Sequence, residues 1–512
     1  MKPSKAFYRL AVCFIAVGAL SLTASGQDAQ QVLRLWVQYN SVKNASMSSM
    51  SEAKKAEVAK LDSAAQAANA SHNYGEAMKD YFHAITVMRG MEWTPSRALG
   101  FGLKVTVDRS VAEPESKIEL RIGQIFKLDQ LPAGPISCTI DLVAGTAGRE
   151  TTRIATLEAV GPDFMTNPSA TQLVIPRETN GNYQLHLTIS PAAGDPVSKD
   201  ISVFVEKGLP DRATRDVAAA VDIESRVKKS GDLALLGSLS SAEYRLALYD
   251  LANSGKMDPK RIDFDKEINA AETEVKEIAA GHNPYSARRG DIRKAYRSQI
   301  DATLQPYRLF VPSTYDGSRA FPLVIALHGM GGDESSIFDQ YGNGAFKLEA
   351  EKHGYIVACP KGREPASMYT GSAEQDVLDV LAEVERDYKV DTDRVYMTGH
   401  SMGAFGTWSI AIDHPELFAA IAPISGGGDP KKIGRIARIP ELVIHGDNDN
   451  TVSVQRSREM VEAGKKAGVE IKYMEIPGGT HVGVALPAFK DIFEWFDAHR
   501  RKPENARAAS GK

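Results

Sequence analysis

The sequence predicts a multidomain protein whose C-terminal part is a mostly parallel, doubly wound α/β sheet, preceded by an all-β sandwich and helical segments. From about residue 305 onward, continuous apolar runs alternate with amphipathic stretches, the pattern of parallel strands covered by helices on both faces. Between residues 99 and 207, short alternating runs are separated by Pro, Gly and Asn, as in antiparallel sheets. A chain of 512 residues is also too long for one ordinary core.

The N-terminus resembles an export signal. Three basic residues within the first nine precede an apolar run from Leu10 to about Leu20, and small residues at 24–26 suit cleavage. The run is too short to span a bilayer, and no other run is long enough. We therefore expect a signal peptide over residues 1–26 and a secreted or periplasmic mature chain without a transmembrane segment.

Composition excludes some partners. The formal net charge is only -4, and basic residues are spread along the chain, so no nucleic-acid partner is expected. Apart from Cys13 in the signal peptide, the chain has only Cys138 and Cys359, which lie in different predicted domains. Two buried free thiols are therefore expected instead of a disulfide framework. Nothing in the sequence indicates an oligomeric state.

The hydrophobic pattern of the N-terminal half changes twice, from helical to strand-like spacing and back. Helical spacing in "YGEAMKDYFHAITVMRGM" is followed by runs such as "KIELRIG" and "YQLHLTIS", which predict an immunoglobulin-like sandwich. Helical patterns then return, and "GHNPYSARRGD" supplies a linker. The predicted segments are a helical segment at 27–98, the sandwich at 99–207, helices at 208–283, the α/β domain at 284–500 and a disordered tail at 501–512.

The α/β pattern begins near Tyr307 with "YRLFVPSTY" and "FPLVIALHGMGG", and continues through alternating helices and strands to a final helix, "ALPAFKDIFEWFDAHR". The helix "AEQDVLDVLAEVERDY" has one apolar stripe at helical spacing, formed by Val377, Val380, Leu381, Val384 and Tyr388. Ligands of such sheets bind at the carboxyl ends of the strands. The residues just after each apolar run are therefore the candidates for chemistry.

Three strand ends carry the residue types of a nucleophile, an acid and a base. Ser401 lies in "TGHSMG", whose glycines at 399 and 403 allow a tight strand–turn–helix corner that exposes the serine. Asp449 follows "IHGDN" and His481 lies in "PGGTHVG". A serine hydroxyl needs a base, the base needs an orienting carboxylate, and the chain order Ser, Asp, His suits this turn type. No metal ion or cofactor is expected.

Two choices remain open from the residues alone. Asp447 is the alternative acid, but Asp449 has the extra reach towards a histidine, and the other aspartate is expected to be structural. His400 cannot comfortably reach back to the adjacent serine, and His328 and His445 are expected to shape turns. Ser401 itself admits a plain tight turn as the alternative to a nucleophile.

The reaction also requires donors for an oxyanion. The backbone N–H of the residue after the nucleophile, Met402, supplies one, and the loop after an earlier strand supplies the other. "HGMGG" at 328–332 is that loop, with the N–H of Met330 as first candidate and Gly329 as second.

With these residues in place, the segment from about 300 to 500 resembles the α/β-hydrolase superfamily. Its motifs "YRLFVPSTYD", "FPLVIALHGMGG", "DTDRVYMTGHSMGAFGTW", "IHGDNDNTVSV" and "GGTHVG" are similar to those of secreted esterases grouped with polyhydroxybutyrate depolymerases, feruloyl esterases and the phospholipase/carboxylesterase group. The resemblance implies Ser401 as nucleophile, Asp449 as acid and His481 as base. Ala404 departs from the family's "SMGG" elbow, and alanine should still fit there.

Access to the site is expected to be open. About 15 residues separate the strands "AAIAPIS" and "ELVIHG", so a large lid is not expected there, and short acyl or polymer-borne esters suit the site. The segment 362–371 could form one wall. Tyr369 and Trp408 are candidates to present aromatic faces to a substrate, with core packing as the alternative.

The sequence therefore predicts an exported serine esterase (carboxylesterase type) that works through an acyl-enzyme on an ester substrate linked to a polysaccharide or a polyester. Two alternatives remain. One is a serine peptidase of the prolyl-oligopeptidase type, which shares the fold and the triad. The other is a polymer-binding protein whose hydrolase fold is inert.

Overall fold

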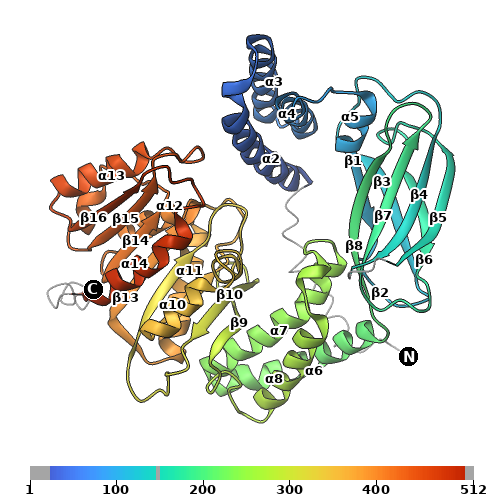
Figure 1. Ribbon diagram of the computed structural model, residues 1–512. Helices are drawn as coiled ribbons and strands as arrows, with labels where there is room; N and C mark the ends of the chain where they lie inside the picture. The colour runs from blue at the N-terminus through green and yellow to red at the C-terminus, as the bar shows by residue number, and fades with distance from the viewer. Residues whose placement is uncertain (1–23, 146–149, 502–512) are drawn as a thin grey trace. The chain divides into compact units, whose positions relative to one another are not determined.

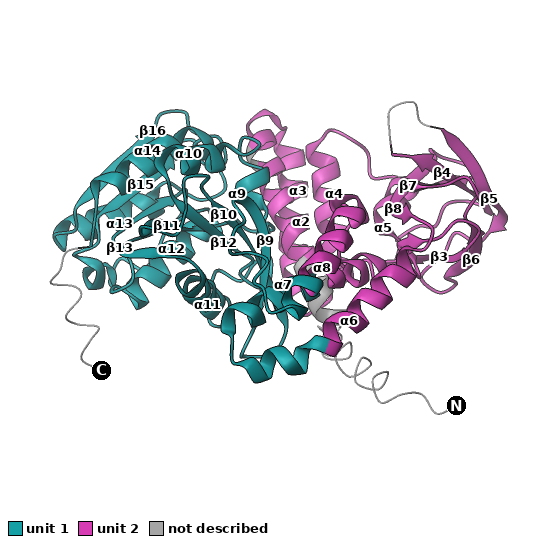
Figure 2. Ribbon diagram, turned by 90° about the horizontal axis from the view of Figure 1, so that it is seen from below, with its two compact units in different colours: residues 1–20, 223–244, 276–512 teal, residues 21–222, 245–275 magenta. Residues whose placement is uncertain are grey.

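The computed structural model describes residues 24–145 and 150–501. Residues 1–23 of the predicted signal peptide and residues 502–512 of the predicted tail lie outside the described residues. Within them, the chain divides into two compact units (Figure 2). The α/β unit comprises residues 223–244 and 276–501, and the sandwich unit comprises residues 24–222 and 245–275.

The α/β unit is built on an eight-stranded sheet, with the order β16-β15-β14-β13-β11-β12-β10-β9. Only β10 pairs antiparallel with both of its neighbours, and all pairs from β12 through β11 to β16 are parallel. The predicted mostly parallel sheet is confirmed. The strands are β9 (Gly290–Arg297), β10 (Leu304–Val311), β11 (Phe321–Leu327), β12 (Ile356–Pro360), β13 (Val390–His400), β14 (Ala420–Ile424), β15 (Glu441–Gly446) and β16 (Ile471–Ile476).

Helices cover both faces of this sheet, so the unit is doubly wound (Figure 1). One apolar core contains the predicted stripe of α11 (Ser372–Asp387), from Val377 to Val384, together with α12 (Met402–Asp413) and α13 (Gln455–Lys466). The core on the other face contains α9 (Ser336–Asp339), α10 (Ala345–His353) and α14 (Ala485–Ala498). Arg501, predicted to begin the tail, donates its backbone N–H to the carbonyl oxygen of Asp393 at 2.9 Å.

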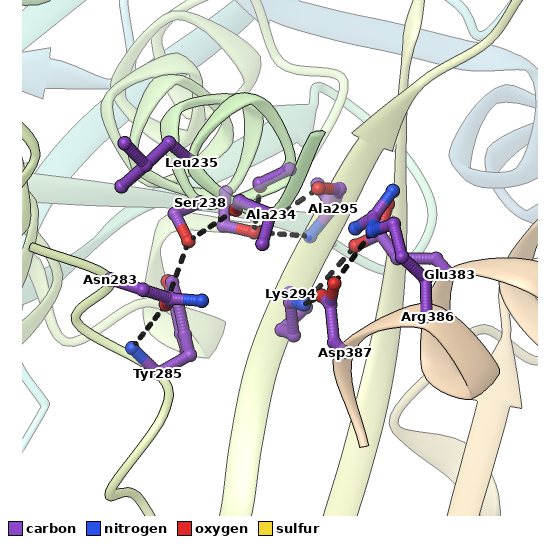
Figure 3. Close-up of polar contacts among 12 residues, drawn as sticks. Ala234, Leu235, Ser238, Asn283, Tyr285, Lys294, Ala295, Glu383, Arg386 and Asp387 are labelled. Carbon is purple, nitrogen blue, oxygen red and sulfur yellow. Dashed lines mark hydrogen bonds and ion pairs between the residues drawn. The ribbon is translucent and has the colours of Figure 1, made fainter. Parts of the chain in front are cut away.

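The edge strand β9 was not predicted, because its sequence "GDIRKAYR" looks like a polar linker. Lys294 on this strand is only 1% exposed; its Nζ lies 2.7 Å from Asp387 and 3.2 Å from Glu383 (Figure 3). Burial alone would lower the pKa of Lys294, but the neighbouring carboxylates outweigh burial and raise that pKa above its usual value. The ammonium therefore stays charged and can be buried in the sheet.

The first part of helix α7 (Leu233–Asn253), up to residue 244, belongs to the same unit and lies along the outer edge of β9. The Ser241 hydroxyl accepts a hydrogen bond from the N–H of Ala295 and lies within hydrogen-bonding distance of its carbonyl oxygen, both at 3.1 Å. These backbone groups point away from β10, so the residue opposite Ala295, Pro306, loses nothing by lacking an N–H. The compact α/β unit thus includes residues 223–244, which precede the predicted boundary at 284.

The sandwich unit holds two sheets, ordered β1-β3-β6 and β2-β8-β7-β4-β5. Buried residues from both sheets, such as Leu120 and Leu187, belong to one apolar core, and β4 alternates between buried and half-buried positions along its length. The strands are β1 (Leu103–Val107), β2 (Val111–Ala112), β3 (Lys117–Gln124), β4 (Ile136–Ala144), β5 (Thr151–Val160), β6 (Ser169–Val174), β7 (Gly181–Pro191) and β8 (Val197–Val205).

Helices complete the sandwich unit and connect the two units. A separate apolar cluster joins α2 (Ala24–Ser46), α3 (Glu52–Ala70) and α4 (Tyr74–Met88), and α5 (Pro95–Gly102) leads into β1. The chain passes between the units within α6 (Leu209–Ser230), α7 and α8 (Phe264–Ala279). Within the described ranges no helix is both long and apolar enough to cross a bilayer. Cys138 and Cys359 are buried and free, as predicted.

Candidate active site

Ser401 lies at a sharp corner between β13 and α12. Its backbone angles, φ +57° and ψ -119°, are ones that a residue with a side chain rarely adopts. A Cβ on Gly399 would lie 2.3 Å from the carbonyl oxygen of Gly403, and a Cβ on Gly403 would lie 2.2 Å from that of Leu327. Only glycine fits at both positions, so the sequence imposes the close approach that exposes the serine.

Alanine at position 404 is accommodated by a glycine opposite. Ala404 is fully buried, and a Cβ on Gly426 would come within 2.4 Å of its methyl group. The departure from the elbow pattern therefore leaves the corner intact.

The structure brings Ser401, His481 and Asp449 together in one hydrogen-bonded line. The Ser401 hydroxyl lies 2.9 Å from His481 Nε2, and His481 Nδ1 lies 2.7 Å from Asp449 Oδ2. The side chain of His481 is 13% exposed, while that of Asp449 is fully buried. The imidazole of His481 is therefore reachable from solvent, and the carboxylate beside it is shielded from solvent.

Asp449 is held in its ionised form by surrounding donors. Burial alone would raise the pKa of Asp449, but contacts with His445 and His481 and the N–H of Val452 outweigh burial and lower that pKa below its usual value. His445 Nε2 lies 3.1 Å from Asp449 Oδ2, and the N–H groups of Thr451 and Val452 donate to Oδ1 at 2.8 and 2.9 Å. A fixed anion at this position favours the N–H tautomer of His481 at Nδ1 and stabilises its protonated form.

Asp447, the alternative acid, does not contact the imidazole and lies on the surface instead. It is exposed and accepts a hydrogen bond from the N–H of Gly478 at 2.7 Å. Its carboxylate therefore braces the loop that carries His481, while the imidazole of His481 donates its hydrogen bond to Asp449.

Three contacts around the base were missed by sequence reasoning. His400 Nε2 lies 2.8 Å from the carbonyl oxygen of His481, and the Ser425 hydroxyl donates to the same oxygen at 3.2 Å. His445 was expected only to shape a turn, yet it also contacts Asp449. No spacing motif signals these contacts, because they join residues between 4 and 81 positions apart through the fold.

The glycine-rich loop after β11 lies beside the nucleophile. A Cβ on Gly329 would lie 3.4 Å from Ser401 Cβ. Within this loop, the N–H groups of Gly331 and Gly332 donate to the carbonyl oxygens of Pro365 and Gly329. Met402 is the first residue of α12, where N–H groups have no acceptor inside the helix and the helix dipole is positive. The candidate donors Met330, Gly329 and Met402 thus belong to segments that flank Ser401.

Tyr369 and Trp408 do not present faces to a substrate, and this candidate role was wrong. Both side chains are 0% exposed and belong to the apolar core. The Tyr369 hydroxyl accepts a hydrogen bond from the N–H of His328 at 3.0 Å, and Trp408 Nε1–H donates to Glu441 at 3.0 Å. The pattern misled because aromatic residues beside an active-site turn are equally suited to packing beneath it.

Within the described residues, no group of three or more His, Cys, Asp or Glu side chains lies so as to hold a metal ion. The arrangement has the groups required for acyl transfer by a serine nucleophile: an oriented base, a buried acid and backbone donors.

Comparison with known proteins supports the resemblance to esterases. Residues 305–471 match the "Esterase" family model. The chain is 30% identical over 141 residues to a bifunctional acetylxylan esterase/xylanase of Neocallimastix patriciarum, covering 26% of this chain and 20% of that protein. It is 29% identical over 159 residues to "Probable feruloyl esterase C" of Aspergillus terreus (30% and 58%). It is also 29% identical over 119 residues to poly(3-hydroxyalkanoate) depolymerase C of Paucimonas lemoignei (21% and 28%).

These matches confirm the predicted resemblance, although the chain spans less than two thirds of each of these relatives. Among solved structures, a thermostable esterase aligns with a TM-score of 0.40 at 19% identity, over 78% of this chain and all of that one. A ferulic acid esterase aligns with a TM-score of 0.34 at 16% identity, over 40% of this chain and 97% of that one.

Proposed function

We propose that this protein is an exported serine ester hydrolase of the carboxylesterase type. The observation that carries the proposal is the line from Ser401 Oγ through His481 to Asp449, with distances of 2.9 and 2.7 Å. The match of residues 305–471 to the "Esterase" family and the esterase relatives support the choice of an ester bond. The predicted signal peptide supports export.

In the proposed reaction, Ser401 Oγ attacks the ester carbonyl carbon while its proton passes to His481 Nε2. Asp449 stabilises the imidazolium through the Nδ1–H hydrogen bond. The N–H of Met402 and that of Met330 or Gly329 donate to the oxyanion. His481 returns the proton to the leaving alcohol, and water, activated by the same histidine, then hydrolyses the acyl-enzyme.

The substrate class we propose is an ester borne on a polymer or a carbohydrate. Only residues 425–440 lie between β14 and β15, which leaves no room for a large lid at that position. The names of three relatives refer to such substrates: feruloyl, acetylxylan and polyhydroxyalkanoate esters. For the sandwich unit we propose an immunoglobulin-like domain; its separate three- and five-stranded sheets and the parallel pairing of β2 with β8 support this assignment.

A fluorophosphonate probe tests the nucleophile. Wild-type protein should be labelled and should hydrolyse short-chain p-nitrophenyl esters, whereas Ser401→Ala should do neither. Asp449→Asn should lower kcat by about 10³–10⁴-fold because the base loses its orienting anion. Asp447→Asn is the matched control, which removes a neighbouring carboxylate and should keep activity within a few-fold.

The same assays separate the alternatives. Labelled protein that cleaves aminoacyl-prolyl amides faster than esters would support the peptidase instead. An unlabelled but folded wild type would support the binding protein with an inert site and would sink the esterase proposal.

A further inference from the structure

The base stands on a loop that has little stiffness of its own. His481 lies between β16 and α14, in a stretch with glycines at 478, 479 and 483. Gly478 has φ +68°, and glycine leaves the backbone with more freedom than any other residue. Contacts from elsewhere in the fold must therefore fix the position of the imidazole.

Asp449 fixes the ring of His481, and a second group of residues fixes its backbone. The carbonyl oxygen of His481 lies 2.8 Å from His400 Nε2 and 3.2 Å from the Ser425 hydroxyl. The other nitrogen of His400, Nδ1, lies 2.7 Å from the hydroxyl of Tyr341. His400 is 3% exposed and immediately precedes Ser401 at the end of β13.

The hydrogen-bond directions follow from the acceptors. A carbonyl oxygen can only accept, so His400 carries its proton on Nε2 and donates it to His481. His400 Nδ1 then offers a lone pair, which accepts the hydroxyl proton of Tyr341. The carbonyl oxygen thus sets the tautomer that holds the loop, and the tyrosine hydroxyl, by donating to Nδ1, stabilises it.

We propose that His400, supported by Tyr341, is a positioning residue that holds the backbone of the base in register with the nucleophile. The role rests on the proposed function of Ser401 and His481. It deepens that function because one side chain, adjacent to the nucleophile in sequence, holds the loop of its partner. A displacement of about 1 Å between reacting groups costs on the order of 10²-fold in rate, so such a lock affects catalysis without touching the substrate.

Burial keeps this lock in one protonation state. Desolvation, together with the charge of the nearby His481 ring, whose centroid is 4.7 Å away, lowers the pKa of His400 to about 4. His400 is therefore neutral near pH 7. Protonation of His481 during turnover leaves the hydrogen bond to its carbonyl unchanged.

Three substitutions in the full-length protein test the role. His400→Phe keeps a ring but removes the donor, and should lower kcat for p-nitrophenyl acetate by about 10–100-fold with KM changed less than two-fold. His400→Gln keeps an N–H donor and should recover most of kcat. Tyr341→Phe leaves Nδ1 of His400 without its partner and should give a smaller fall, about 3–10-fold. His353→Phe is the matched control, since His353 is a largely buried histidine in the same unit whose ion-pair partners, Glu349 and Asp497, are not residues of the triad.

Amide hydrogen exchange across residues 479–484 supplies a readout that needs no ester hydrolysis. The donorless His400→Phe protein should exchange faster there, while His400→Gln and His353→Phe should match the wild type. Unchanged kcat and exchange in folded His400→Phe would overturn the positioning role, and so would a His400→Gln protein as slow as His400→Phe. If His400→Phe does not fold, Tyr341→Phe carries the same test. A wild type without esterase activity would sink the proposed function alone, and exchange would then decide the positioning role.

Discussion

Glu441 is a carboxyl group in the interior of the α/β unit. It is 0% exposed; Oε2 accepts the N–H of Trp408 at 3.0 Å, and Oε1 has no hydrogen-bond partner. Burial raises the pKa of Glu441 to about 7, against the lowering effect of the Trp408 hydrogen bond. The group is therefore protonated in the folded protein at a pH where the unfolded chain has already lost that proton.

The sign of the pH dependence follows. Between pH 4.5, the ordinary pKa, and about pH 7 the folded state binds a proton that the unfolded state lacks. Stability therefore falls as pH rises through this window and levels off above it, by about 3 kcal/mol in total. Glu441→Gln should remove this fall, so urea unfolding of wild type and variant should differ more at pH 8 than at pH 5. Glu462→Gln, at an exposed carboxylate, is the control. A difference that stays constant between the two pH values would contradict the raised pKa.

At the residue scale, the sequence predicted which side chains meet at the candidate site better than it predicted the contacts that hold them. Ser401, Asp449 and His481 each follow a strand, and strand ends of a parallel sheet converge at one edge. The contacts of His400 and Ser425 use a backbone carbonyl, which every residue has, so the sequence contains no signal for them. Tyr369 and Trp408 were misjudged as candidate substrate contacts because proximity to the elbow says nothing of the direction in which a side chain points.

At the scale of elements, β9 and α7 show how a sheet edge is closed. β9 would otherwise expose unpaired N–H and C=O groups, which invite association with other strands. The hydroxyl of Ser241 on α7 accepts the N–H of Ala295 and lies 3.1 Å from its carbonyl oxygen. The strand escaped prediction because Arg293 and Lys294 break its apolar pattern, and the carboxylates of α11 that accept Lys294 are about 90 residues away in sequence.

Ser241→Ala tests this closure. It leaves the buried N–H of Ala295 without its acceptor, so the free energy of unfolding should fall by about 1–3 kcal/mol. Chemical denaturation followed by circular dichroism measures the loss. The same change at the exposed hydroxyl of Ser318 should alter the free energy by less than about 0.5 kcal/mol. Equal effects of the two substitutions would show that α7 does not protect the edge.

At the scale of the whole molecule, the four large apolar clusters of the described chain each draw their residues from a single unit. The sequence predicted the change from helices to a sandwich and then to an α/β sheet, because each has its own hydrophobic period. It could not predict that residues 223–244 join the α/β unit, since this depends on which surface their helix covers.

Because each unit has its own core, a substitution in one core should destabilise that unit and leave the other unchanged. Leu187→Ala, in the sandwich core, should lower the melting temperature of the sandwich unit by about 5–15 °C in calorimetry. It should leave hydrolysis of a soluble ester at 25 °C unchanged. Leu323 is equally buried in the α/β core. Leu323→Ala should leave the melting temperature of the sandwich unit unchanged and lower the hydrolysis of the soluble ester. Melting of both units at a lower temperature after either change would show that they unfold as one.

Each unit contains one buried cysteine, so the alkylation of that cysteine reports when its own unit opens. A thiol reacts as the thiolate; burial raises the pKa of Cys138 to about 11 and that of Cys359 well above its usual value. Cys138 lies in the core of the sandwich unit and Cys359 in that of the α/β unit. An alkylating reagent therefore modifies each cysteine only when its own unit opens, and mass spectrometry of the two peptides would time the two openings in a single sample.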